Sequence, residues 1–189
     1  MAVMIEKKSA LKAFFYFMFI DGRIDDSEKV RFDEIGLEFM GDEYASAKEE
    51  ISAECNELIK GIDDESEAYD VVQEAIDAAL KNTVDENGIG SRLLLWNLFA
   101  IAIADNDHSE NENRLINHIA RVLQIDKSVV LEMKQLIATI NKLEQERDML
   151  EDSTEPYREV RPVVVEVEKR LDVLLKVSIC YIVRNVIAA

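Results

Sequence analysis

The fold is decided by the stretch Asp21-Gly22-Arg23-Ile24-Asp25-Asp26-Ser27-Glu28, an acidic turn between two apolar segments. A second stretch, Asp105-Asn106-Asp107-His108-Ser109-Glu110-Asn111-Glu112, repeats the arrangement 84 residues later. In both, an apolar segment ends at an Asp, a Glu follows seven positions after that Asp, and an amphipathic segment begins. We call these stretches the first and second acidic elbows. Their recurrence predicts an internal repeat of two pseudo-symmetric helix–acidic turn–helix units.

The composition favours long helices over short strands. Six Gly and two Pro occur among 189 residues, whereas an array of strands and turns needs more of both. Hydrophobic residues make up 48% of the chain, which is enough to build a core. We therefore expect an all-α fold, a helical bundle of about seven to eight helices.

Apolar residues at spacings of three and four, followed by glycine stops, locate the helices. Residues 82–90 are the clearest loop, and residues 153–162, with both prolines, interrupt a long helix. Residues 91–104 are apolar nearly all round, which places them at the centre of the bundle. Residues 163–167 are also compatible with an extended backbone at the start of the last segment. The expected helices are residues 3–20, a segment from Asp25 or Asp26 to Met40, residues 43–60, 64–81 and 91–104, a segment from the second elbow to Leu123, a long segment from Asp126, and residues 163–189.

These elements predict a bundle followed by an extension. The bundle comprises residues 1–152, with repeat units at about 3–61 and 91–152 around a middle helix at 64–81. Residues 153–189 are the extension, which either packs back on the preceding helix as an antiparallel arm or forms a dimerisation seam. Charged residues recur along this last segment, so we expect no membrane span.

The charge of the chain is strongly acidic and unevenly distributed, with a formal net value of −17. Residues 1–90 hold 23 acidic and 9 basic side chains, net −14, whereas residues 91–189 hold 16 and 13, net −3. Because nucleic acid is a polyanion that such a surface repels, we expect no nucleic-acid partner. Cations and basic proteins are better candidates as partners, and we expect them to bind mainly to residues 1–90.

Cysteine usage and the N-terminus favour a cytoplasmic protein. Cys55 and Cys180 lie at helix-like apolar positions without a CxxC spacing, and we expect both to be reduced thiols. An apolar run at residues 11–20 follows basic residues, but no small-residue cleavage site comes after it. We therefore expect no signal peptide.

Helix capping explains part of each elbow. Asp25 and Ser109 match in position, and each is followed three residues later by Glu28 or Glu112. At this spacing the cap side chain and the Glu satisfy each other's backbone amides, an arrangement called a capping box. Capping thus explains these four residues without any ligand.

Asp21 and Asp105 need a further explanation. Each is expected at the C-terminal end of an apolar helix, where the helix dipole makes a carboxylate unfavourable by about 0.3–1 kcal/mol. A divalent cation, Ca²⁺ or Mg²⁺, held by carboxylates of the elbow would offset this cost. A hydrogen bond from elbow amides to the Asp is the alternative. The expected metal ligands are Asp21, Asp25, Glu28, Asp105, Asp107 and Glu112.

Other metal sites fit less well. The second elbow is not an EF-hand, because Glu110 occupies the sixth position, where Gly is needed, and Ile116 the twelfth, where Glu is required. Zinc is disfavoured because His108 and His118 are ten residues apart and no cysteine lies near them in sequence. We expect His118 to be a partly buried histidine on the surface of its helix rather than a ligand.

The first elbow resembles a known family. An apolar helix ending in Ile20-Asp21, then Gly22-x-Ile24-x-x-x-Glu28 and an amphipathic helix, is similar to the TerB-like tellurite-resistance family. The domain of that family also occurs at the N-terminus of some membrane-anchored J-domain cochaperones. The resemblance covers about residues 5–150 and implies two pseudo-symmetric helical units around a middle helix. The second elbow departs from the pattern, with Asn106 for the Gly and His108 for the apolar residue.

The resemblance implies a role in stress or metal-oxyanion resistance, with acidic clusters that bind cations and partner proteins of a stress-resistance complex, and no enzymatic activity. The residues agree on the last point, since the chain has no GxSxG, Walker or HExxH motif and only two histidines. Two functions stay open. The first is a noncatalytic stress-response module that binds a divalent cation or a partner protein through its elbows. The second is a structural adaptor that forms a homodimer through residues 163–189, with no metal role.

Overall fold

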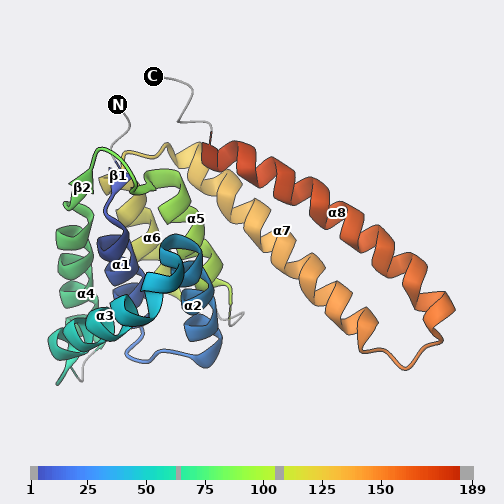
Figure 1. The fold of residues 1–189 in the computed structure, drawn as a ribbon, viewed down its shortest axis with the longest axis horizontal. Helices are drawn as coiled ribbons and strands as arrows, with labels where there is room; N and C mark the ends of the chain where they lie inside the picture. The colour runs from blue at the N-terminus through green and yellow to red at the C-terminus, as the bar shows by residue number, and fades with distance from the viewer. Residues whose placement is uncertain (1–3, 63–64, 105–108, 184–189) are drawn as a thin grey trace.

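The computed structural model describes residues 4–62, 65–104 and 109–183, and helices dominate it (Figure 1). The all-α prediction is confirmed, with one small sheet added. The helices are α1 (Lys7–Met18), α2 (Asp26–Met40), α3 (Tyr44–Ile59), α4 (Glu65–Leu80), α5 (Ser91–Ala102), α6 (Glu110–Val122), α7 (Lys127–Glu151) and α8 (Tyr157–Val183), with a 3₁₀ turn at Gly41–Glu43. The strands are β1 (Met4–Ile5), β2 (Thr83–Val84) and β3 (Ile89–Gly90).

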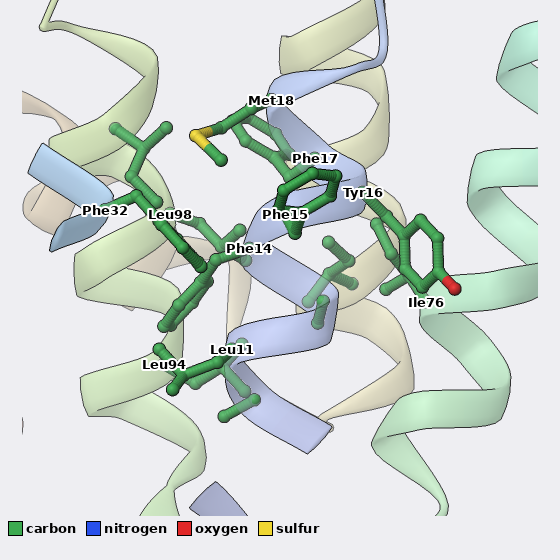
Figure 2. Close-up of a cluster of buried hydrophobic side chains, with 14 of the residues drawn as sticks. Leu11, Phe14, Phe15, Tyr16, Phe17, Met18, Phe32, Ile76, Leu94 and Leu98 are labelled. Carbon is green, nitrogen blue, oxygen red and sulfur yellow. The ribbon is translucent and has the colours of Figure 1, made fainter. Parts of the chain in front are cut away.

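Two apolar helices form the centre of the bundle. α1 packs against α2, α3, α4 and α5, while α5 packs against α1, α2, α6, α7 and α8. In Figure 2, Phe14 of α1 lies on the side of Leu94 and Leu98 from α5, and Tyr16 points the other way, toward Ile76 of α4. Each fully buried Phe or Leu stabilises the fold by about 1.5–3 kcal/mol. Both helices lead into an acidic elbow, so this core fixes where the elbows begin.

The N-terminal residues form a strand where the sequence predicts a helix. The helix predicted at 3–20 begins only at Lys7, because β1 lies between β2 and β3 and is antiparallel to both. The loop predicted at 82–90 therefore contributes two strands. Glu6 then caps α1, its carboxylate accepting a hydrogen bond from the Ser9 amide at 3.2 Å. Strands of two residues are too short to produce an alternating pattern in the sequence.

Helices α7 and α8 form an antiparallel hairpin that projects from the bundle (Figure 1). Ile140 and Leu143 of α7 pack with Val167 and Leu171 of α8 in a small core of their own. This packing is one of the two arrangements expected for the extension; the dimer seam and the division of the chain at residue 152 stay predictions. Within the described residues, no helix combines the length and apolar character that a bilayer crossing needs.

The sequence predicts a helix break that extends as far as Pro162, and this prediction is wrong. Helix α8 begins at Tyr157 and continues through Pro162, so the break is confined to residues 152–156. The extended start considered for residues 163–167 is also wrong. A proline this close to the helix start removes one backbone hydrogen bond, and burial of the α8 apolar stripe in the hairpin core offsets that loss.

Candidate functional site

The first acidic elbow turns the chain from α1 into α2. Helix α1 ends at Met18, and Gly22 adopts a left-handed backbone conformation with φ of +77°, which favours glycine. Asp25 then caps α2, and the Glu28 carboxylate accepts a hydrogen bond from the Asp25 amide at 2.9 Å. Both halves of the predicted capping box are present, so that prediction is confirmed.

The second acidic elbow ends in the same kind of cap. The Ser109 hydroxyl accepts a hydrogen bond from the Glu112 amide at 3.0 Å, and the Glu112 carboxylate accepts one from the Ser109 amide at 2.9 Å. This capping box is confirmed as well. Asp105, Asp107 and His108 lie outside the described residues. The assignment of Asp105 and Asp107 as ligands therefore stays a prediction.

The two elbows meet at one small hollow, which we call the acidic hollow. Its volume is about 20 Å³, room for about one water-sized group. The described residues that line it are Met18, Ile20, Asp21, Arg23, Asp25, Glu28 and Glu112. Four of the six predicted ligands thus share one site, with three from the first elbow and Glu112 from the second. From the sequence, each elbow is predicted as a separate feature, because no local spacing pattern links Asp21 to Glu112.

Two of the four carboxylates in the acidic hollow are buried. Glu28 is 6% exposed and Glu112 is 4% exposed. Each lies in the first turn of its helix, α2 or α6, where unpaired amides and the helix dipole favour a negative charge. The hollow is therefore a meeting point of two helix N-termini, which explains how both glutamates are buried. Asp21 and Asp25 lie outside these helices, and the Asp25 side chain is 42% exposed.

Arg23 is the basic member of the described lining. Its Nε lies 3.8 Å from a carboxylate oxygen of Asp25, and its side chain is 72% exposed. An exposed ion pair this long is weak, so Arg23 offsets little of the surrounding charge. Counted as formal charges, the described lining holds four acidic residues and one basic residue. This net charge of −3 attracts cations to the hollow.

The described residues of the acidic hollow do not by themselves form a preformed metal centre. Across residues 4–62, 65–104 and 109–183, no three side chains of His, Cys, Asp or Glu lie close enough together to hold an ion. Calcium needs several oxygen ligands at about 2.3–2.6 Å. A cation held by the described carboxylates alone therefore requires them to move closer together than they lie in the structure.

His118 contacts an acidic residue of another helix. Its Nε2 lies 2.8 Å from Oδ1 of Asp77 in α4, and the side chain is 20% exposed, so the predicted partly buried histidine is confirmed. One turn earlier in α6, the Arg114 guanidinium lies 4.5 Å from the centre of the Tyr69 ring. Both contacts tie α6 to α4. Sequence reasoning missed them because the partners are far apart along the chain and no spacing rule pairs them.

Comparison with family models decides the family. The model described as tellurite resistance protein TerB matches residues 10–135. The chain belongs to the TerB family. The TerB match begins in α1, includes both acidic elbows and ends in the first part of α7, so the resemblance noted in the first elbow is confirmed. Most of the α7–α8 hairpin lies beyond the TerB match. The searches of curated proteins and of solved structures returned no match.

Proposed function

We propose that this TerB chain is a noncatalytic stress-response module, acting in tellurite resistance or a related stress, that binds a divalent cation at the acidic hollow. The observation that supports the cation role is the convergence of Asp21, Asp25, Glu28 and Glu112 from two elbows at one hollow. Membership of TerB, a family of noncatalytic domains, supports a binding role over an enzymatic one.

Ca²⁺ or Mg²⁺ fits the acidic hollow better than a softer ion. The four acidic residues supply hard oxygen donors, which these cations prefer over nitrogen and sulfur. Asp105 and Asp107 complete the proposed ligand set. Because the ligands must move together to bind, we expect the affinity to lie at the weak end of protein calcium sites, with a Kd of about 10⁻⁴–10⁻³ M.

Binding of this strength stabilises the folded chain measurably. With about 10 mM cation and a Kd of about 1 mM, a ligand that binds only the folded state adds about 1.4 kcal/mol to the free energy of unfolding. For a domain of this size, that stabilisation raises the melting temperature by about 3–6 °C.

Thermal unfolding with and without about 10 mM CaCl₂ or MgCl₂, at constant ionic strength, tests the cation role. The wild type and an Asp42→Asn control should show the full shift, because Asp42 lies in the exposed 3₁₀ turn after α2. A double variant, Asp21→Asn with Asp25→Asn, should shift by less than about 1 °C. Equal shifts in all three chains would place the cation elsewhere, and no shift in the wild type would refute the cation role.

We also propose that protein partners of a stress-resistance complex bind the acidic first half of the chain, in the cytoplasm. The charge of −14 over residues 1–90 supports a basic partner surface. Two free thiols, Cys55 and Cys180, are consistent with a reducing compartment.

Exposed apolar residues on α8 favour a second candidate function. In this case the chain is a structural adaptor that forms a homodimer through residues 163–189, and the elbows only cap helices. Four exposed apolar residues from Val173 to Ile179 support this candidate. A measurement of molecular mass tests it independently of the cation titration.

A further inference from the structure

The α7–α8 hairpin carries its tip, residues 146–164, away from the helical bundle (Figure 1). The small core of the hairpin, with Ile140 and Leu171, lies between the bundle and the tip along both helices. No residue of the tip belongs to the main core of the bundle. The TerB match ends at residue 135, so the whole tip also lies beyond the matched domain. What the tip presents to other molecules therefore needs an explanation of its own.

A pocket of about 350 Å³ opens between the two helices at the hairpin tip. Its apolar wall consists of Leu150 from α7 and Tyr157, Val160 and Val164 from α8. Val164 is buried, whereas Leu150 and Val160 are only partly buried, since the helices leave the space between them unfilled here. Ligand pockets in proteins start at about 300 Å³, so this pocket has room for a single large side chain rather than a whole peptide.

Two strongly exposed apolar side chains lie at the same tip. Tyr157, in the pocket lining, is 76% exposed, and Met149, which precedes Leu150, is 70% exposed. Single exposed apolar residues are common, but two at one tip that also holds an apolar pocket form a patch of the kind that marks an interaction site. Tyr and Met are both enriched at protein–protein interfaces. The apolar residues of the tip therefore favour a protein partner.

The hairpin tip is acidic, and part of its charge is not compensated. Residues 146–164 hold six acidic and three basic side chains, a formal net charge of −3. Each of the three arginines pairs with an acidic residue of its own helix; Arg161, which lines the pocket, pairs with Glu168 at 3.8 Å. Within the described chain, no ion pair involves Glu151, Asp152 or Glu155, and all three are exposed. Glu151 and Glu155 line the pocket, so its rim is negatively charged.

A hydroxyl in the pocket lining has no hydrogen bond. Ser153 follows α7, and its Oγ is buried with no hydrogen-bond partner among the residues that the structure describes. A buried polar group without a partner costs about 1–3 kcal/mol. Rotation about one side-chain bond turns the hydroxyl toward the pocket, where a polar group of a bound molecule can reach it. Binding at the pocket would therefore satisfy a group that the free chain leaves unpaired.

We propose that the hairpin tip binds an exposed segment of a partner protein in which Lys or Arg residues flank one large apolar side chain. The apolar side chain enters the pocket between Leu150 and Tyr157, and the basic residues face Glu151 and Glu155. This arrangement has the apolar centre and polar rim that are typical of protein interfaces. The charge of the tip selects this occupant, because a second acidic tip, an anionic membrane and nucleic acid would all be repelled.

Labelled synthetic peptides test the pocket and the charge separately by fluorescence anisotropy. The first probe has one Trp between two pairs of Lys; the second replaces the Trp by Ser, and the third replaces every Lys by Glu. The contact is much smaller than the roughly 800 Å² per partner of a standard interface, so we expect a Kd of about 10⁻⁵–10⁻⁴ M for the first probe with the full chain. The Ser peptide should bind at least about tenfold more weakly, and the Glu peptide should not bind.

The comparison between the Trp and Ser peptides removes the effect of overall charge. The chain carries a formal net charge of −17, so both Lys peptides are attracted equally to other acidic surfaces. The ratio of their Kd values, measured at about 150 mM salt to screen such attraction, therefore reports the pocket. Equal Kd values for the two Lys peptides would overturn the proposal, as would binding of the Glu peptide.

Substitution of the exposed tyrosine tests the pocket from the side of the protein. Tyr157→Ala should raise the Kd of the Trp peptide at least about fivefold and leave that of the Ser peptide unchanged. Leu37→Ala is the matched control, because Leu37 is 57% exposed on α2. It should bind both peptides as the wild type does. Equal effects of Tyr157→Ala and Leu37→Ala would overturn the proposal.

Charge reversal tests the rim of the pocket. Glu151→Lys/Glu155→Lys should raise the Kd of the Trp peptide at least about tenfold. The double variant Glu34→Lys/Glu38→Lys changes the total charge equally, at two exposed glutamates that are also four residues apart. It should keep the wild-type preference for Trp over Ser. Circular dichroism checks that every variant retains the wild-type helix content. An equal loss in both double variants would mean that only the total charge matters and would overturn the proposal.

NMR spectra of the full chain locate the bound peptide directly. The Trp peptide should cause its largest amide chemical-shift changes within residues 146–164. Largest changes in α2 or α3 instead would overturn the proposal and assign the basic peptide to the acidic first half of the chain. If the Trp peptide does not bind and Tyr157→Ala instead abolishes self-association in sedimentation velocity, a second copy is the occupant, and the proposal is likewise overturned.

Discussion

Gly36 is the position at which one added carbon should have the clearest effect on stability. A Cβ atom at Gly36 would lie 2.0 Å from Cε2 of Tyr44, which is far closer than non-bonded carbon atoms approach. Tyr44 is 4% exposed and packs edge-on against Phe32, with ring centres 6.3 Å apart. Its phenol donates a hydrogen bond of 2.6 Å to Asp33. The substitution Gly36→Ala therefore forces a buried, hydrogen-bonded ring to move.

The expected cost combines three effects. Loss of a hydrogen bond to a charged acceptor costs about 1.5–3 kcal/mol. Overpacking of a filled site costs about 1–3 kcal/mol. The greater helix propensity of Ala over Gly returns about 1 kcal/mol. We therefore expect Gly36→Ala to lower the free energy of unfolding by about 1.5–5 kcal/mol, a large share of the roughly 5–15 kcal/mol of a typical domain.

Urea unfolding of Gly36→Ala, Tyr44→Ala and the double variant measures this cost. In the Tyr44→Ala background the obstructing ring is absent, so Gly36→Ala should be neutral or stabilise the fold by up to about 1 kcal/mol. This strong non-additivity distinguishes a clash with Tyr44 from a general effect of changing α2. If Gly36→Ala alone lies within about 0.5 kcal/mol of the wild type, the packing argument is wrong.

Two further predictions concern Cys55. Cys55 is fully buried, and burial raises its pKa to about 11, whereas Cys180 is exposed, so a disulfide reagent such as DTNB should titrate one thiol in the native chain and two in denaturant. The raised pKa also makes stability depend on alkaline pH. The contribution of the buried Cys55 thiol to stability is complete below the ordinary thiol pKa of 9.0. It is lost as the pH rises toward 11, because the unfolded chain ionises first. We expect a loss of about 2–3 kcal/mol over this window, and Cys55→Ala should flatten that part of the pH profile of urea unfolding. An equally steep profile in Cys55→Ala would assign the loss to other groups, such as Tyr44, whose pKa is raised by burial and by its bond to Asp33.

The features predicted correctly from the sequence are those with short spacing. Both capping boxes depend on residues three apart, and the apolar stripes of the helices depend on spacings of three and four. The composition of residues 91–104 is also sufficient to place α5 at the centre of the bundle. The errors lie where tertiary contacts outweigh a local preference. Met4–Ile5 joins a sheet instead of extending α1. Helix α8 continues through Pro162 because the apolar stripe that follows the proline, with Val167 and Leu171, packs against α7.

The candidate site likewise combines features that are predicted from the sequence with one that only the tertiary structure shows. The acidic residues of each elbow, and the TerB-like pattern of the first, are evident in the sequence. The single hollow that combines them is not, because it depends on α1 and α5 packing together so that two elbows 84 residues apart meet.

The sequence by itself determined the helices, their caps and the two acidic elbows, because these depend on interactions within one or two helical turns. Only the tertiary structure decided that Glu112 joins Asp21, that Gly36 has no space for a side chain beside Tyr44, and that one face of α8 stays exposed. Such features arise from the packing of one element against another, and contacts between distant residues leave no fixed spacing in the chain.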